Sequence, residues 1–332
     1  MRSQGITSQT FFEDVEPGAQ IPPLTRRATI PHEVKYAGAS RDFATIHYDQ
    51  EVGKKSPWGT SILYGMIKSG FMTKMAGDLA GPQGVVRYLK FAYRRSDVIG
   101  DTLSITGTIS KKYEAEDGHI VECDLKMVNG KGEDSTIGTA RVALPSKKKT
   151  ERVRWASAPS IEIRRDGARR GEEDLTDLDE IRRTAGIPWK PWVADISGTW
   201  IRMFAYAVED MNPLYVDEEW AAKSGPYGSI IAPPTFLAAL DPLYRHDEGP
   251  VAPPAPPDPK KKYKGGGNGW DEFEWFTPIR PGDVITSYCS WDTPYEKTGK
   301  SGALAFIPRV VVYENQRREI VARSRGEIIR VL

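Results

Sequence analysis

The chain has 332 residues, of which 39% are hydrophobic, and this length favours two folding units over one. Its 46 Lys and Arg residues nearly balance its 45 Asp and Glu residues, so no net charge points to nucleic acid or to a membrane surface. The two cysteines lie far apart, and neither a signal-like N-terminus nor an 18-residue apolar run is present, so we expect a soluble, cytoplasmic protein.

The first half opens with a helical pattern from Val34 to Ala39, followed by the motif DFATIHYD at residues 42–49. A second helix is predicted from about Thr60 through Ala80. It is apolar on nearly every side, as is typical of a helix wrapped by a sheet. After RRSDVIGDTL, three alternating segments predict antiparallel strands with one buried face: LSITGTISKKY, HIVECDLKMVN and STIGTARVAL.

Residues 147–196 are predicted to connect two units. Basic and acidic clusters alternate there, and a solvated surface is the simplest interpretation of those charges. Pro188 and Pro191 are expected to interrupt regular structure. The first unit is therefore placed at residues 1–146 and the second at residues 197–332.

The second half repeats the order of the first. A helical pattern from Thr199 to Val208 precedes DMNPLYVD at residues 210–217, and FTPIRPGDVI echoes RRSDVIGDTL before three more alternating segments. The central helix is shorter, from Thr235 to Leu240, because Asp241-Pro242 ends it. We therefore predict an α+β fold of two fused units, each an antiparallel sheet around a central helix.

These motifs resemble a known family. DFATIHYD followed by ILYGM resembles the signature of MaoC-like, R-specific enoyl-CoA hydratases, Asp-x-Asn-Pro-x-His-x-Asp and then His-Gly-Met. VEDMNPLYVDEEWAAKSGPYGSIIAPPTF followed by WFTPIRPGD resembles the non-catalytic half of two-domain MaoC-like dehydratases. The resemblance implies a double hot-dog fold, with a catalytic first unit and a degenerate second unit.

Carried over position by position, the family's catalytic Asp and His fall on Asp42 and His47, and its carbonyl-binding glycine falls on Gly65. The family's Asn and Pro are Ala44 and Thr45 here, so a side chain that orders the motif loop is missing. A carboxylate and an imidazole on one loop can hold a water between them and share its protons. A backbone N–H at a helix N-terminus can stabilise the enolate oxygen.

The second motif keeps the loop consensus and loses the reactive groups. Tyr215 replaces the His, and Pro233 and Pro234 stand where a backbone N–H is needed. Asp49 and Asp217 recur in both halves, which favours a structural role as capping residues.

The expected reaction is reversible hydration of a trans-2-enoyl thioester, expected as the CoA ester, in fatty acid metabolism. The R-3-hydroxyacyl product is implied by the resemblance alone. No cofactor is expected beyond the CoA thioester that serves as substrate, and the four histidines show no metal-ligand spacing.

Other readings stay open. The same residues could run the reaction backwards, as a 3-hydroxyacyl thioester dehydratase of chain elongation, on CoA or on an acyl carrier protein. A hot-dog subunit that binds acyl thioesters without turning them over is a second class, which Ala44 favours. A hot-dog thioesterase is a third class, but the predicted central helix carries no carboxylate motif that would support it. A homodimer is compatible with an exposed sheet edge, but the sequence does not fix it.

Substrate-binding candidates surround this motif. Tyr64 replaces the family's His, although an aromatic residue beside a buried helix is more often part of the core. Arg87, Lys90, Arg94 and Arg95 are candidates for the phosphates of the carrier, with simple solvation as an equal alternative.

Two further hypotheses concern the second half. The run from Lys260 to Lys264 is another phosphate candidate. The short central helix predicts space for a long, branched or ring-bearing acyl chain, unless Trp270, Phe273 and Trp275 fill that space.

Overall fold

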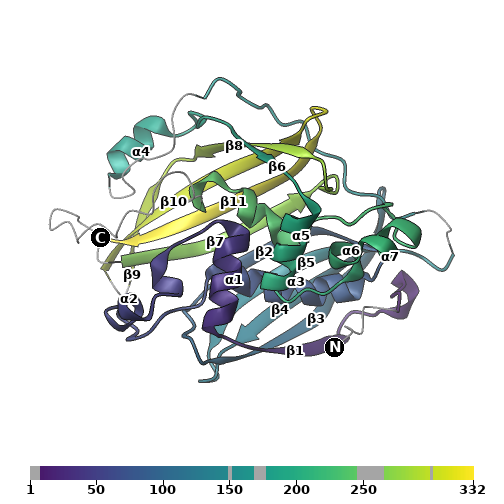
Figure 1. The fold of residues 1–332 in the computed structure, drawn as a ribbon, viewed down its shortest axis with the longest axis horizontal. Coiled ribbons are helices and arrows are strands. Elements are labelled where there is room, and N and C mark those ends of the chain that lie inside the picture. The colour runs from purple at the N-terminus through teal and green to yellow at the C-terminus, as the bar shows by residue number, and fades with distance from the viewer. Residues whose placement is uncertain (1–7, 149–151, 168–176, 245–264, 300–301) are drawn as a thin grey trace.

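The computed structural model describes residues 8–148, 152–167, 177–244, 265–299 and 302–332. These residues form one 11-stranded sheet, with helices laid over one of its faces (Figure 1). The strand order is β1-β3-β4-β5-β2-β7-β11-β10-β8-β6, with β9 paired to β10. All the strand pairs are antiparallel.

The first half supplies one side of this sheet and the helix that fills it. Its elements are η1 (Phe12–Asp14), β1 (Gln20–Arg27), α1 (Ile30–Ser40), η2 (Thr45–His47), α2 (Gln50–Lys54), α3 (Gly65–Ala80), β2 (Val85–Tyr93), β3 (Thr102–Ala115), β4 (Gly118–Val128) and β5 (Asp134–Leu144).

The second half supplies the other side in the same order of elements. They are α4 (Leu178–Thr184), β6 (Trp192–Asp195), α5 (Gly198–Ala207), α6 (Pro213–Val216), α7 (Glu218–Lys223), η3 (Pro234–Leu240), η4 (Pro242–Tyr244), β7 (Gly265–Trp275), β8 (Val284–Trp291), β9 (Tyr295–Gly299), β10 (Gly302–Asn315) and β11 (Ile320–Val331).

The halves join through β2 and β7, where Leu89 pairs with Phe273. Outward from this junction, the order β2-β5-β4-β3-β1 on one side mirrors β7-β11-β10-β8-β6 on the other. The predicted repeat and the continuous sheet are therefore confirmed. β6 lies inside the predicted connector and pairs with β8 at the sheet edge. The part of the sheet that belongs to the second half therefore begins before Ser197.

Helix α3 is buried over nearly its whole length, as its apolar pattern predicts. It begins at Gly65 and not near Thr60, because Ile62 forms a β-bridge with Val98 and the Leu63 N–H donates to Asp97 O. Lys68 is also buried, 2.9 Å from Asp97 Oδ2, and this ion pair ties the helix to the loop before β3. A buried charge of this kind is tolerated when it is paired.

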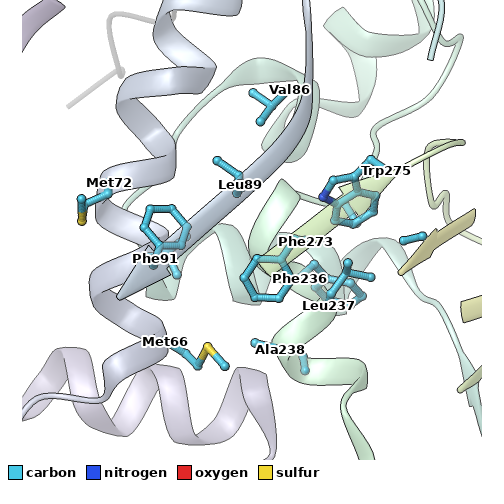
Figure 2. Packing of buried hydrophobic residues seen from close by; sticks show 14 of the residues in the cluster. Met66, Met72, Val86, Leu89, Phe91, Phe236, Leu237, Ala238, Phe273 and Trp275 are labelled. Carbon is cyan, nitrogen blue, oxygen red and sulfur yellow. The ribbon is translucent and has the colours of Figure 1, made fainter. Parts of the chain in front are cut away.

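The hypothesis of space beside the short second helix is wrong. The 3-10 helix η3 is short, as predicted, but Phe273 and Trp275 are buried against it (Figure 2). Phe236 and Leu237 of η3 lie beside them in the same cluster. Trp270 points to the opposite face of β7, since side chains alternate along a strand. The aromatic residues of β7 thus replace the missing turns of helix.

Candidate active site

The first motif loop follows directly from a tight ending of α1. Arg41 adopts the left-handed conformation with φ 65°, and its N–H donates to Ala37 O. The helix therefore ends directly before Asp42. Glu209, which precedes the second motif, has the same unusual backbone with φ 52°. Non-glycine residues rarely adopt this conformation, so its recurrence indicates that the two loops belong to one repeated structural motif.

Asp42 is the buried acid of the first loop, with 9% of its surface exposed. The Ala44 N–H donates to its Oδ1 atom at 3.1 Å. Burial disfavours the charged carboxylate and raises the pKa of Asp42 to about 7, against the smaller, opposing effect of the Ala44 N–H. Near neutral pH the group can therefore both give and accept a proton.

His47 ends the single turn of η2 and is held as a neutral base. Its Nδ1 lies 2.8 Å from Ile62 O, and because a carbonyl oxygen only accepts, Nδ1 carries the hydrogen. The lone pair is then on Nε2. The ring stacks on Tyr64 with centroids 3.6 Å apart. Burial lowers the pKa of His47 to about 4, against the bond to Ile62, so the imidazole is uncharged at neutral pH.

Tyr64 connects Asp42 and His47 to the start of α3. Its hydroxyl donates to Asp42 O at 2.6 Å, and its N–H donates to Glu33 Oε2 at 3.0 Å. Glu33 is fully buried, and burial raises its pKa to about 8. Sequence reasoning missed this carboxyl, although an acidic residue inside the apolar pattern of α1 was an available signal. Tyr64 is itself 2% exposed, so its hydroxyl holds the motif loop from inside the core.

Gly65 is the first residue of α3, where backbone N–H groups have no partner within the helix. A Cβ added at Gly65 would lie 3.5 Å from Asn268 Nδ2 and 3.6 Å from the Tyr93 ring. The helix N-terminus carries partial positive charge. The structure therefore brings Asp42, His47 and Gly65 together through the shared contacts of Tyr64.

The basic candidates are distributed differently. Arg87 is buried and its Nη1 lies 2.6 Å from Asp117 Oδ2, six residues before the Tyr93 end of β2. Lys90 lies on the outer face of the sheet, over the Trp270 ring and 3.5 Å from Glu272. Neither joins the motif loop.

Two further basic candidates directly follow β2. Arg94 and Arg95 are exposed and directly follow Tyr93, so they stay candidates for the carrier's phosphates. The run from Lys260 to Lys264 lies outside the described residues.

In the described part of the chain, the second motif loop is packed so that no space for an acyl group lies beside it. Asp210 is buried, and burial raises its pKa to about 6. Pro234 is the first residue of η3 and offers no N–H. The cavity lined by Tyr215, Trp155 and Pro234 has a volume of only about 20 Å³, which suits a single water and no acyl group.

The capping role predicted for the repeated aspartates is confirmed. Asp49 accepts from the N–H groups of Glu51 and Val52 at the start of α2. Asp217 accepts from the Trp220 N–H at the start of α7. Both therefore satisfy helix N-termini and are unavailable as the third member of a catalytic set.

Two general features of the described residues bear on the site. Nowhere in the described part of the chain do three or more His, Cys, Asp or Glu side chains gather as metal ligands would. Within the same residues, every helix is too short or too polar to cross a bilayer.

Comparison with known families divides the chain as its internal repeat does. Residues 16–129 match the family described as MaoC like domain. Residues 183–324 match the family described as FAS1-like, dehydratase domain region. The interval between the two matches, residues 130–182, overlaps the predicted connector at residues 147–182.

Curated relatives cover parts of the chain. A UPF0336 protein of Thermobifida fusca is 37% identical over 86 residues, which are 26% of this chain and 53% of that protein. An (R)-specific enoyl-CoA hydratase of Rhodospirillum rubrum is 27% identical over 101 residues, which are 30% of this chain and 69% of that protein. The chain spans about half the length of the first curated relatives it matches.

Solved structures match nearly the whole chain. A MaoC domain protein dehydratase from Chloroflexus aurantiacus superimposes with a TM-score of 0.70 at 11% identity, covering 98% of each chain. A conserved Mycobacterium tuberculosis protein with a double hot-dog fold superimposes with a TM-score of 0.63 at 12% identity, covering 97% of this chain and 98% of that one. At these identities the likeness shows the fold, and the predicted double hot-dog fold is confirmed.

Proposed function

We propose that this protein, a double hot-dog chain with a MaoC-like first half and a FAS1-like dehydratase region in its second, reversibly hydrates a trans-2-enoyl-CoA to the R-3-hydroxyacyl-CoA. The observation that carries the proposal is the pairing of a buried acid with a neutral imidazole on one loop, beside a helix N-terminus. Similarity to the hydratase of Rhodospirillum rubrum supports the reaction class and the stereochemistry.

The mechanism follows from the protonation states. His47 Nε2 takes a proton from water as the water oxygen bonds to C3. The C2=C3 electrons move toward the thioester, and the Gly65 N–H stabilises the oxygen that becomes negative. Asp42 in its protonated form gives its proton to C2. The proton on His47 then returns to Asp42, so that one water has been added and both residues are restored.

Dehydration is the same path reversed. The Asp42 carboxylate removes the C2 proton, and protonated His47 gives a proton to the departing hydroxyl. The catalyst does not favour a direction, which is set by the supply of substrate and product.

The test compares equivalent residues of the two loops. Hydration of crotonyl-CoA and of a longer or branched enoyl-CoA is followed by loss of the conjugated-thioester absorbance. Asp42→Asn and His47→Ala are expected to lower kcat/KM by about 10³-fold or more, in line with removal of a proton-transfer group. Asp210→Asn is the matched control and is expected to stay within about twofold of wild type.

Circular dichroism establishes that each variant is folded. A folded wild-type protein that binds acyl-CoA yet hydrates no member of the panel would reject catalysis and leave the acyl-binding subunit. Equal losses in Asp42→Asn and Asp210→Asn would reject the assignment of the site to the first loop.

A further inference from the structure

Asn268, on β7 of the second half, lies against the helix terminus of the first half. Its Nδ2 atom is 3.5 Å from the position that a Cβ on Gly65 would take. The same position is 3.6 Å from the Tyr93 ring, on the strand that pairs with β7. The amide therefore stands where the proposed carbonyl site meets the second half.

The partners of Asn268 fix which end of its amide faces Gly65. Arg309 Nη2 donates to the Tyr244 hydroxyl oxygen at 3.0 Å, and a guanidinium can only donate. The Tyr244 hydroxyl must then give its own proton elsewhere, and Asn268 Oδ1 lies 3.0 Å away. The amide oxygen is committed to Tyr244, so the NH2 group is the end directed at Gly65.

Arg309 is itself held firmly. It is 3% exposed, with Nε 2.9 Å from Asp241 Oδ2 and Nη2 3.2 Å from Asp271 Oδ1. Separating Arg309 from both carboxylates would leave an uncompensated buried charge, so this arrangement resists rearrangement. The network extends from the end of η3 to Asn268 and fixes the amide before any ligand arrives.

The network also lies within electrostatic range of the motif loop. Burial is the main reason that the pKa of Tyr244 lies well above its usual value, and the Asp42 carboxylate raises it further. Tyr36, buried between the halves, has its pKa raised chiefly by burial, with contributions from both Asp42 and Tyr244. Asp42 and Tyr244 therefore both lie close enough to Tyr36 to influence its titration.

We propose that Asn268 Nδ2 is a second hydrogen-bond donor to the thioester carbonyl oxygen, acting with the Gly65 N–H, and that Tyr244 and Arg309 position it. Two donors can share one oxygen when their nitrogens lie within about 6 Å, because each bond is about 2.9 Å long. Negative charge gathers on this oxygen as the enolate forms. Donors fixed in advance then stabilise the transition state more than the bound substrate. Asn268 exchanges no proton in this role, and the inference rests on the proposed function.

The kinetic test uses Asn268→Ala and Asn268→Asp in the full-length protein. Both are expected to lower kcat/KM for crotonyl-CoA by about 10²-fold, through a lower kcat and a higher KM, and the Asp variant should lose more, since it places an acceptor where a donor is needed. Tyr244→Phe, which frees the amide to rotate, is expected to lose about tenfold. Asn212→Asp is the matched control: it makes the same change in the second loop, keeps the oxygen that accepts from the Leu214 N–H, and should stay within about twofold.

A binding test separates a carbonyl contact from a structural role. Butyryl-CoA and its thioether analogue S-butyl-CoA differ by the carbonyl, so Asn268→Ala should weaken binding of the former about tenfold and leave the latter unchanged. Turnover within threefold of wild type in both Asn268 variants overturns the inference while leaving the hydratase proposal intact.

If the wild-type protein hydrates nothing, the proposed function fails, and the binding test alone decides the inference. Selective loss of butyryl-CoA binding supports a carbonyl-binding Asn268. An equal effect on both ligands, or binding of neither by wild type, overturns it.

Discussion

The two motif loops follow residues with the same left-handed backbone conformation, but they differ in helix capping and in side chains. In the second loop, Asn212 accepts from the Leu214 N–H and caps α6. In the first loop, Ala44 stands at the same place, and η2 is a single 3-10 turn with no side-chain cap. The loop with the better cap has a tyrosine in place of the imidazole, whereas the uncapped loop has the acid and the imidazole of the proposed mechanism. The side-chain cap and the proposed reactive pair thus lie on different copies of the motif.

The loops also meet α3 at different points. The first lies at its N-terminus, where Gly65 can donate to a developing negative charge. The second lies beside Gly77, whose added Cβ would be 3.9 Å from both Asp210 Oδ2 and the Tyr215 hydroxyl. Backbone N–H groups there are used within the helix. The helix therefore supports anion stabilisation at one loop only.

Among changes outside the proposed acid–base pair, the largest effect should come from matched glycine substitutions in α3. Gly65→Ala places a methyl group where the substrate oxygen must approach, although the protein around it has room, so kcat/KM should fall about 10²-fold in a folded protein. Gly77→Ala also has room and should raise the unfolding free energy by about 0.5–1 kcal/mol without changing activity. Urea denaturation and hydration assays check both, and equal activities would remove the distinction between the loops.

The pH profile comes next in size. Hydration needs protonated Asp42 and neutral His47, so kcat/KM should fall about tenfold per pH unit above about pH 7 and fall again below about pH 4. Asp210→Asn should leave both limbs in place. Hydration that rises through pH 7 would mean that the Asp42 carboxylate, and not the acid, is the required form.

Substitutions of the two buried acids, Asp42 and Asp210, should differ less in their effect on stability than in their effect on activity. The folded-state pKa of Asp42 is raised to about 7 and that of Asp210 to about 6, so each folded form binds a proton more tightly than the unfolded chain does. Stability is then greatest below the unfolded pKa and is lost as pH rises to the folded pKa. At pH 8, Asp42→Asn should stabilise by up to about 4 kcal/mol and Asp210→Asn by about 3 kcal/mol. Denaturation at pH 4 should show little gain in either variant.

The smallest effect concerns the missing cap. Ala44→Asn restores in the first loop the residue that caps α6 in the second, and should stabilise the protein by about 1 kcal/mol. A thermal melt checks the gain, with Thr45→Asn, one position too late to cap, as the control. A gain in the control alone would show that the loops do not share the capping geometry.

Much of the fold was accessible from the sequence because it rests on local patterns. Period-two alternation predicted β3, β4, β5, β8, β10 and β11, and the repeat predicted two joined units. The junction strands β2 and β7 were not predicted as strands, since the glycine run that opens β7 is atypical of a strand interior. β6 was missed for a similar reason, because it begins directly after Pro191.

The residues of the proposed site were predicted from one motif, but their partners were not. Asp42, His47 and Gly65 fall within 24 residues, so a family resemblance could place them. Glu33 contacts the Tyr64 N–H from another helix, and Asn268 approaches Gly65 from the other half. Lys90 was assigned to the site by proximity in sequence, yet the alternation of β2 puts it on the outer face of the sheet.

The sequence by itself determined the duplicated order of elements, the loss of reactive groups from the second half and the candidate acid and base of the first, because each depends on residue type and short spacing. Only the tertiary structure decided the protonation of Asp42 and His47, since burial moves the pKa of one up and of the other down. It also decided that Phe273 and Trp275 fill the space beside η3 and that Asn268 faces Gly65. The contact between Asn268 and Gly65 joins residues about 200 positions apart, and no local pattern encodes it.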